Sequence, residues 1–418
     1  MEIFAYINAA LGIIFTLCYM YQVIYIPIAL FKKNKPHKET KMHKYAILIA
    51  ARNEATVIEH LINSLKNQTY PAELFRIFVV ADNCTDNTAE IARSCGAEVY
   101  ERFNTEQVGK GYALDYLITK IEETYGEEAF DGYMVFDADN VAAKNFVEEM
   151  NKTFSDGYRA VTSYRNSKNY GDSWISAGSS MWFLRDSQFL NRARMKINSS
   201  CLIAGTGFLV HRDVLKKTGG WKYFLIVEDT EFTVRQMIDG EKIGYCENAM
   251  VFDEQPVGFG VSWKQRMRWA YGGWVVLRAY GKRLVKRIFT GPSYSCFDMF
   301  MSFFPAMFLS MLILFFNVVS SILTCIVGQN ILLFFTSMLQ LAINLYSMFF
   351  LVSLTTTIAE WKRIYCPAWK KILYIFTFPI FMITYIPMPA FAMFRKVEWK
   401  PVEHNRSKDL SEIMGGDK

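Results

Sequence analysis

The sequence predicts an α/β domain that is held between membrane-spanning helices. Apolar residues make up 52% of the 418-residue chain and gather near both of its ends, whereas the middle alternates short β-rich runs with helical patterns. A chain of this length can form two or three domain-sized units. Its high apolar content excludes a disordered chain. Its formal net charge of +6 is too small to indicate nucleic-acid binding by itself.

The first apolar segment predicts a transmembrane helix. Residues 3–31 are almost entirely apolar, and six Lys against one Glu follow in residues 32–44. About 20 apolar residues suffice to span the hydrocarbon core, and a signal peptide would have a basic start and a shorter apolar run. We therefore expect a membrane helix within residues 1–31, with the N-terminus outside, and a basic cytosolic linker over residues 32–44.

Residues 45–260 are expected to form the soluble domain. Short strands alternate with helices here, a pattern typical of a parallel sheet covered by helices. The predicted strands are 45–50, 75–81 and 132–138, and the predicted helices lie near 55–66 and 87–95. The eight cysteines include no CxxC pair, so we expect reduced thiols rather than a metal–cysteine site or a disulfide scaffold.

Residues 261–290 are predicted to form amphipathic helices at the membrane surface. Between residues 255 and 297 the chain has eight Lys or Arg and no Asp or Glu, with three Trp among them. A basic, Trp-containing amphipathic helix is typical of a segment that lies on anionic lipid, where each basic residue contributes about 1 kcal/mol.

Residues 291–395 are predicted to hold at least three further membrane helices. Residues 297–358 and 372–394 are again strongly apolar, and basic residues place the loop between the last two helices in the cytosol. Three crossings would leave the basic tail, residues 396–418, outside, which contradicts its charge. Either residues 297–358 hold a further crossing, or one segment is re-entrant or interfacial.

Polar side chains follow three of the predicted strands. The first strand runs into Glu54, the second into Asp82, and the third into Asp137 and Asp139. Ligands of parallel α/β sheets bind beyond the carboxyl ends of the strands, and two carboxylates at i and i+2 can hold Mg²⁺ or Mn²⁺ together with substrate phosphates. Each pattern alone also fits an ordinary turn or helix cap. Their succession favours a nucleotide and a metal ion.

Three further patterns carry chemistry. Lys110 stands in a Gly-Lys-Gly turn that opens a helix, where it can contact a phosphate. Asp229 lies among other carboxylates that raise its pKa toward that of a general base, although acidic residues at a helix N-terminus have the same pattern. Gln265, Arg268 and Trp269 share one helical face, which suits either lipid or a pyrophosphate.

Seven motifs in this order over residues 45–275 resemble those of the membrane-embedded family 2 glycosyltransferases. They are AARNE, VVADNCTDNT, GKGYAL, DAD, GTGFLVHR, VED and QRMRW. That family includes the cellulose, hyaluronan, chitin-oligosaccharide and poly-N-acetylglucosamine synthases. The resemblance implies a GT-A (Rossmann-like) fold with flanking transmembrane helices, a UDP-sugar donor, Mg²⁺ or Mn²⁺, and a multi-pass protein of the cell membrane whose catalytic domain is cytosolic.

The resemblance also implies a role for each matching residue. Asp229 is the base that deprotonates the acceptor hydroxyl, and Asp139 is the metal ligand. The donor and its pyrophosphate are held by Ala51, Glu54, Asp82, Lys110, Asp137, Gln265, Arg268 and Trp269. The acceptor site is bordered by residues 174–190, Gly205, Thr206, Gly207 and, in the tail, Trp399.

These roles together predict an inverting enzyme. A single base opposite the leaving group turns an α-linked UDP-hexose, glucose or N-acetylglucosamine, into a β-linked polysaccharide, which the enzyme passes through its own membrane helices. Departures narrow the prediction: VED stands where cellulose synthases have TED, no regulatory domain is expected after the helices, and the tail lacks the hyaluronan-synthase pattern. Two alternatives are a single transfer to a membrane lipid and a nucleotide-sugar receptor without catalysis.

Overall fold

The computed structural model describes residues 2–291, 293–328, 331–395, 397 and 406–415. An eight-stranded sheet with the order β3-β2-β1-β4-β7-β6-β8-β5 forms the centre of the soluble domain. The strands are β1 Tyr45–Ala51, β2 Phe75–Asp82, β3 Glu98–Arg102, β4 Gly132–Asp137, β5 Val141–Ala142, β6 Ala160–Ser167, β7 Phe208–His211 and β8 Ile243–Asp253.

The sheet is mixed, which corrects the expectation of a parallel sheet. Strands β3, β2, β1 and β4 are parallel, as predicted, but β7 runs antiparallel to both β4 and β6. Phe208 pairs with Val135 and His211 with Gly132. Strand β7 therefore begins close to the edge where β4 ends. Strand β7 has only four residues and follows the helical segments between residues 174 and 196, so the sequence shows too few alternating residues to predict the strand.

Two apolar cores cover the two faces of the sheet. Successive residues of β1 alternate between them: Ala46 and Leu48 pack in one core, and Tyr45, Ile47 and Ile49 in the other. Because both faces are buried, the strand appears in the sequence as an uninterrupted apolar run. One core takes in α4 Lys110–Tyr125 and α6 Trp174–Arg185, and the other takes in α2 Ile58–Lys66, α3 Thr88–Ser94 and α5 Phe146–Ser155.

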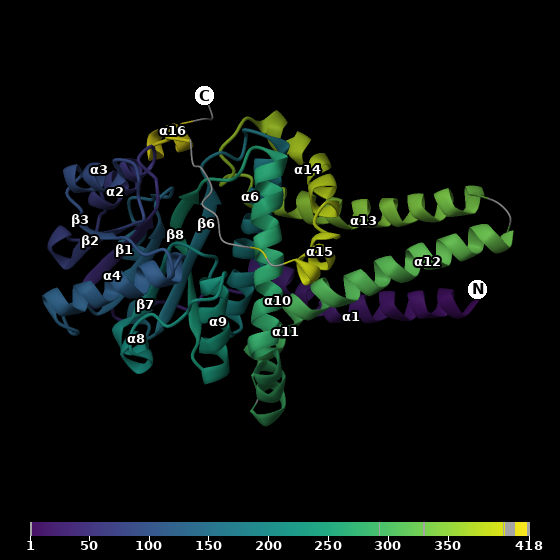
Figure 1. The fold of residues 1–418 in the computed structure, drawn as a ribbon, viewed down its shortest axis with the longest axis horizontal. Helices are drawn as coiled ribbons and strands as arrows, with labels where there is room; N and C mark the ends of the chain where they lie inside the picture. Colours follow the sequence, from purple (N-terminus) through teal and green to yellow (C-terminus); the bar gives the residue numbers. More distant parts are fainter. Residues whose placement is uncertain (1, 292, 329–330, 396, 398–405, 416–418) are drawn as a thin grey trace.

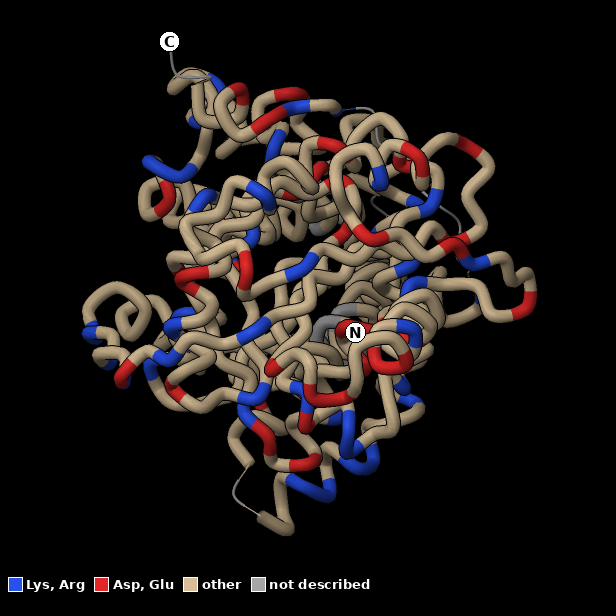
Figure 2. The backbone as a smooth tube through the Cα atoms, turned by 90° about the vertical axis from the view of Figure 1, so that its left-hand side faces the viewer, with Lys and Arg blue, Asp and Glu red and all other residues tan. Residues whose placement is uncertain are grey.

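The remaining helical elements connect the sheet or flank it. They are η1 Ala72–Leu74, the π-helical η2 Asp186–Asn191, α7 Arg192–Lys196, α8 Arg212–Thr218, α9 Glu228–Asp239, α10 Phe259–Thr290, α11 Tyr294–Phe304, the π-helical η3 Pro305–Leu309, α15 Met388–Phe394 and α16 Leu410–Met414. All eight cysteines are free thiols. Figure 2 shows Lys and Arg interspersed with Asp and Glu over the soluble end of the molecule, in keeping with the small net charge.

Three long helices project side by side from the soluble domain (Figure 1). They are α1 Glu2–Phe31, α12 Ser310–Gly328 and α13 Ile331–Glu360. Among the residues that the structure describes, four segments are long and apolar enough to cross a membrane: Ala10–Phe31, Tyr294–Gly328, Phe334–Glu360 and Ala368–Phe394. The first three segments contain the projecting helices.

The fourth apolar segment runs in a different direction. It divides into α14 Ala368–Ile383 and α15, whose start carries Pro387 and Pro389, residues that lack the N–H needed to continue a helix. In Figure 1, α14 and α15 run across the base of the projecting helices beside α6 and α10. A Cβ at Gly178 of α6 would lie 2.4 Å from the Phe381 ring, so α6 needs glycine there to admit α14. This packing favours the interfacial reading of the third C-terminal segment.

The described part of the tail, residues 406–415, lies against the soluble domain. The Arg406 Nε is 3.2 Å from an oxygen of Asp172, and the Ser407 hydroxyl is 2.5 Å from the His60 ring. Ile413 of α16 is buried with Val141 and Phe252.

Candidate active site

The loops that follow β1 and β2 are tied together by their own polar side chains. The backbone N–H of Ala55 donates to Asp86 (3.2 Å), that of Thr85 to the Asn53 side chain (2.8 Å), and that of Glu54 to the Thr88 hydroxyl (2.9 Å). These bonds hold Glu54 just beyond the carboxyl end of β1, three residues after Ala51. Asn53 and Asp86 serve the loops themselves, as ordinary turn residues do.

Asp82 is buried at the end of β2 against a cation that sequence reasoning missed. The Arg102 guanidinium donates to Asp82 at 2.5 Å, and both side chains are less than a tenth exposed. Burial raises the pKa of Asp82, and the hydrogen bond and charge of Arg102 oppose that rise. Arg102 faces Asp82 in the register of β2 with β3, so only strand pairing over 20 residues reveals it.

Lys110, the first residue of α4, connects three elements of the site. Its Nζ donates to Asp137 at the end of β4 (2.5 Å) and to the carbonyl of Gly205 (2.7 Å), and lies 4.0 Å from Glu228 on α9. Burial alone lowers the pKa of Lys110, but the surrounding carboxylates raise it above the ordinary value. The neighbouring Gly111 is required because a Cβ there would meet the Tyr223 carbonyl oxygen at 2.2 Å.

The Gly-Thr-Gly segment lies between the end of β4 and α9. The Asp137 N–H donates to the Thr206 hydroxyl (2.9 Å), which in turn donates to Asn140. A Cβ at Gly205 would be 3.6 Å from an Asp229 oxygen, so the backbone passes directly beside that carboxylate. Gly207 has φ +61°, and a Cβ there would clash with Ser163 at 2.5 Å, so both glycines are needed for this path.

Asp229 and Glu228 stand in the first turn of α9, where both residues are half-buried. The Thr230 N–H donates to Asp229 at 2.7 Å. Burial raises the pKa of Asp229; the Thr230 bond and the charges of Lys110 and Arg165 oppose this, while Asp137 adds to it. Burial likewise raises the pKa of Glu228, partly against Lys110 and reinforced by Asp229. Three carboxylates thus surround one lysine, which leaves an excess of negative charge in a partly buried site.

Asp139 is 4% exposed and accepts from Asn140 (3.2 Å) and from the Glu254 N–H (3.3 Å). Nearby Asp253 ends β8, where it pairs with Arg165 of β6; sequence reasoning missed both residues because only the pairing of β6 with β8 brings them together. Within the described ranges, no three His, Cys, Asp or Glu side chains cluster as a metal cage. Asp137 and Asp139 still fit a hard cation that completes its shell with phosphate and water.

Helix α10 carries Gln265, Arg268 and Trp269 past the start of α9. A Cβ at Gly272 would lie 2.4 Å from Val227, the residue before Glu228, so α10 approaches α9 closely. The Trp269 ring meets Phe183 of α6 edge-on, with centroids 5.8 Å apart.

The polar groups of this helix differ in their partners. The Gln265 Oε1 is buried, and neither it nor the Arg268 side chain bonds to the part of the chain that the structure describes. Arg266, which sequence reasoning passed over, instead donates to Thr384 (2.8 Å) and lies over the Phe381 ring. It ties α10 to the break between α14 and α15.

The structure therefore brings part of the predicted site together. Lys110, Asp137, Gly205, Thr206 and Asp229 form one connected group, with Glu54, Asp82 and Asp139 at neighbouring strand ends. Gln265 and Arg268 share α10 but contact none of this group directly. Trp399 lies outside the described residues.

Comparisons with known proteins bear on the whole chain. The sequence profile described as "Glycosyltransferase like family 2" matches residues 43–272. The probable glycosyltransferase YdaM of Bacillus subtilis (strain 168) is 28% identical over 302 residues, which are 66% of this chain and 67% of that protein. The β-monoglucosyldiacylglycerol synthase of Synechocystis sp. (strain PCC 6803) is 27% identical over 54% of this chain and 47% of its own.

A third relative is the poly-β-1,6-N-acetyl-D-glucosamine synthase of Staphylococcus epidermidis (strain RP62A), 27% identical over 59% of this chain and 60% of its own. The chain thus spans about half to two thirds of the length of these curated relatives. Among solved structures, the mannosyltransferase PcManGT of Pyrobaculum calidifontis, in complex with GDP-Man and Mn²⁺, matches 94% of this chain and 99% of its own with a TM-score of 0.58 and 14% identity. At that identity the likeness shows the fold alone, which is GT-A-like as predicted.

Proposed function

We propose that this chain, which belongs to family 2 of the glycosyltransferases, transfers a hexose from a UDP-sugar to an acceptor hydroxyl at the cytosolic face of a membrane. The observation that carries the proposal is the group around Lys110. Lys110 bonds to Asp137, at the strand end that a donor diphosphate occupies in α/β sheets, and to the carbonyl of Gly205, whose backbone passes beside Asp229.

On the donor side, Glu54 and Asp82 lie at adjacent strand ends and accept hydrogen bonds from the base and ribose of the nucleotide. Lys110 and Arg268 supply positive charge for the departing diphosphate. A divalent ion held by Asp139 with Asp137, Mg²⁺ or Mn²⁺, would neutralise the same charge when bound. Fixed cations aimed at a leaving group stabilise the transition state because they need no reorganisation as the bond breaks.

On the acceptor side, Asp229 takes the proton of the attacking hydroxyl. Burial raises its pKa, and a base whose pKa lies nearer to the working pH drives proton transfer more efficiently. Burial raises the pKa of Glu228, one residue away, as well, and the neighbouring charge of Asp229 raises it further. A single base facing the leaving group implies inversion at the anomeric carbon.

The membrane arrangement supports an acceptor site at the cytosolic face. If α1, α12 and α13 cross the bilayer and α14–α15 lies at its surface, three crossings put the N-terminus outside and the tail on the side of the catalytic domain. The contacts of Arg406 with Asp172 and of Ser407 with His60 fit that placement. This topology also places the basic linker and the basic tail in the cytosol, where basic loops of membrane proteins are enriched.

Two acceptor classes fit this site. The order of motifs through QRMRW, and the relative that carries the name of a poly-N-acetylglucosamine synthase, support a β-linked polysaccharide, built from glucose or N-acetylglucosamine and passed through the membrane helices. Under this proposal Trp399 and the Gly205–Gly207 segment border the growing chain.

The second candidate is a single transfer to a membrane lipid. In the most apolar part of Ala10–Phe31, 11% of the residues are buried inside the protein, and in that of Tyr294–Gly328 the share is 6%. Helices with so little protein contact face lipid over most of their surface, and three of them form a narrow bundle with little room for a glycan path. The relative named as a β-monoglucosyldiacylglycerol synthase supports the same reading.

Product size and solubility distinguish the two candidates. Purified protein in vesicles with Mn²⁺ or Mg²⁺ is offered each radiolabelled UDP-sugar in turn, and products are separated by size and by partition into organic solvent. Label in high-molecular-mass material supports the polymerase, and label confined to the lipid phase supports the single transfer. A nucleotide-sugar receptor would bind the donor with neither product.

A further inference from the structure

A cavity of about 540 Å³ lies away from the active site, where the basic linker meets α5, α7 and β8. Its walls include the residues before β6 and the first residues of β8, at the amino ends of these strands. The active site is at the opposite edge of the sheet, because β6 runs parallel to β4 through the shared antiparallel neighbour β7. None of the proposed catalytic or donor-binding residues lines the cavity.

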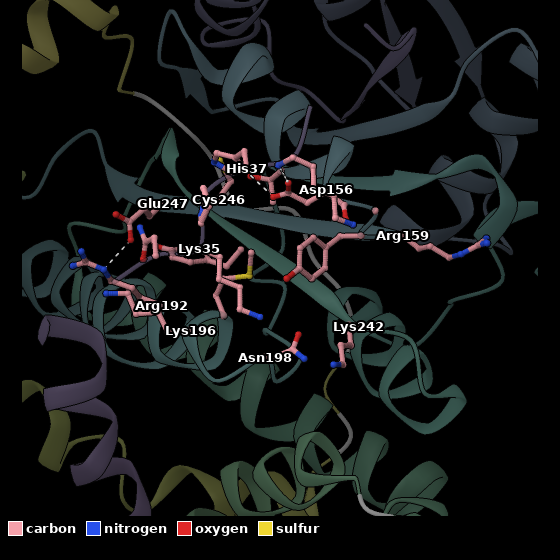
Figure 3. A pocket seen from close by; sticks show the side chains of 18 of the residues that line it. Lys35, His37, Asp156, Arg159, Arg192, Lys196, Asn198, Lys242, Cys246 and Glu247 are labelled. Carbon is pink, nitrogen blue, oxygen red and sulfur yellow. Dashed lines mark hydrogen bonds and ion pairs between the residues drawn. The ribbon is translucent and has the colours of Figure 1, made fainter. Parts of the chain in front are cut away.

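The lining of the cavity is basic. Six Lys or Arg stand against three Asp or Glu. The acids already have partners: Asp156 is 2.8 Å from His37 and bonded by Lys38, Glu247 is 2.8 Å from Arg192, and Glu241 is within 4.0 Å of Lys217. The side chain of Arg159 points away from the cavity (Figure 3) and pairs with Asp213.

Three lysines of the cavity are left without an acidic partner among the described residues. Lys35 and Lys242 are exposed and make no ion pair or hydrogen bond there. Lys196 is 7% exposed, and its Nζ donates only to the carbonyl of Ala29 (2.8 Å). Burial lowers the pKa of Lys196 and the charge of Arg192 lowers it further, and the charge of Glu247 only partly opposes the two. An anion in the cavity would relieve this repulsion.

The cavity borders the end of a predicted membrane helix. Ala29, the acceptor of the Lys196 bond, lies in the last turn of α1. Tyr25 and Ala29 are buried there against Phe189, Leu190 and Ala193. Arg192 and Lys196 lie next to each other on one wall, and Lys35 enters from the linker (Figure 3). If α1 crosses the bilayer, its last turn lies at the interface, and the cavity beside that turn lies close to the lipid phosphates.

We propose that this cavity binds the phosphate headgroup of an anionic phospholipid. The proposal rests on α1 crossing the membrane, and it is independent of the sugar that the enzyme transfers. Cations near a bilayer surface attract anionic lipid, and a cavity of this volume can admit a glycerol phosphate headgroup. Helix α7 presents Arg192 and Lys196 to the cavity and Arg194 to Asp298 of α11. A bound headgroup would steady the helix that joins the soluble domain to the membrane helices.

The test measures lipid binding directly. Short-chain phosphatidylglycerol or phosphatidylcholine is titrated into the full chain in detergent, and bound lipid is counted by native mass spectrometry. We expect phosphatidylglycerol to bind in preference to phosphatidylcholine. Lys35→Ala/Lys242→Ala should weaken its affinity about thirtyfold, from about 1 kcal/mol for each cation near the surface. Both lysines are exposed and unpaired, so their removal orphans no buried group. Lys120→Ala/Lys216→Ala removes the same charge from distant helices and should leave affinity unchanged.

Three results would overturn the proposal: no preference for phosphatidylglycerol, equal affinity in the two double variants, or equal displacement by inorganic phosphate and by soluble lipid. The last result would identify a site for a soluble anion instead. Lys196→Arg, which keeps the buried charge, should bind lipid as the natural chain does. Because donor binding and transfer are read separately, a failed glycosyltransferase assay leaves the lipid measurement valid, and the reverse also holds.

Discussion

Two groups of charged side chains, one buried and one half-buried, differ in how well their charges are neutralised. At the junction with the membrane helices, Asp298 of α11 accepts from the Arg194 Nε (2.6 Å) and Nη2 (3.2 Å), from Tyr21 (2.8 Å) and from Tyr25 (3.1 Å). One cation meets one anion there, and the carboxylate is fully bonded. In the active site, Asp137, Glu228 and Asp229 share Lys110, and Arg165, whose charge also acts on Asp229, is itself paired with Asp253.

The difference separates a structural group from a chemical one. A buried pair whose bonds are all made holds its surroundings in place, and loss of one partner strands the other charge. Carboxylates in excess over cations instead have raised pKa values and can take up a proton. The matched group therefore fixes the soluble domain on its membrane helices, and the unmatched group is suited to proton transfer and to binding a cation or a phosphate.

The largest predicted effect is on the rate of glycosyl transfer when Asp229 is replaced. Asp229→Asn should lower the rate of glycosyl transfer by about 10³-fold, since general-base catalysis typically contributes 10² to 10⁴, while the affinity for UDP stays within about twofold. Asp239→Asn makes the same change at the other end of α9 and should leave transfer unchanged. Transfer by Asp229→Asn at near the natural rate would remove Asp229 from the mechanism.

At the junction, the corresponding change should unfold the protein rather than inactivate it. Arg194→Met strands the Asp298 carboxylate and should lower the free energy of unfolding by about 3–5 kcal/mol. The measurement is thermal unfolding of the full chain in detergent. Arg212→Met, which breaks a surface pair with Asp131 at 3.6 Å, should cost about 0–1 kcal/mol.

A double variant sharpens this second prediction. Arg194→Met/Asp298→Leu removes both charges and should recover much of the lost stability, because no buried charge is left unpaired. If the double variant is as unstable as Arg194→Met, the cost belongs to packing around α7 and the junction is not an electrostatic clamp.

Arg268 extends the active-site side of the comparison to α10. Arg268→Ala should lower transfer by about 10²-fold, the usual cost of removing one donor that stabilises developing negative charge. Lys264, exposed on the same helix, provides the matched variant Lys264→Ala, which should be neutral. Equal activities of the two variants would show that Arg268 does not reach the diphosphate.

The smallest predicted effect is a gain in stability at the active site. The folded-state pKa of Asp229 is raised above its unfolded value, so the folded state binds the proton more tightly and the stability present at low pH is lost as pH rises through the raised pKa. Asp229→Asn removes that loss and should be more stable by about 1 kcal/mol above that pH. The measurement is melting temperature against pH. Equal melting temperatures at all pH values would contradict the raised pKa.

Much of the fold and part of the site could be predicted because they depend on local pattern. The apolar runs of β1, β2 and β4 and the residues directly after them stand together in the sequence, and their succession predicted the rim that holds Glu54, Asp82 and Asp137. The Gly-Lys-Gly turn that opens α4 was likewise readable.

What could not be predicted depends on pairing between distant segments. Arg102 is recognisable as the partner of Asp82 only through strand register, and Asp253 as a neighbour of Asp139 only through the bond that Asn140 makes to both. Strand β7 is too short to predict its direction. Hydropathy predicted an apolar helix over 372–394, but the glycine on α6 that admits α14 gives no signal before the two helices are seen together.

The central claim is that the unmatched carboxylates around Lys110 form the centre of glycosyl transfer, with Asp229 as the base. The most direct test compares the natural chain with Asp229→Asn in vesicles, measuring UDP affinity and transfer of label from each UDP-sugar in parallel. The account predicts that one donor labels polymer or lipid with the natural chain, and that the variant binds UDP equally well with transfer about 10³-fold lower. Undiminished transfer by the variant, or the loss of UDP binding together with transfer in a folded variant, would contradict it.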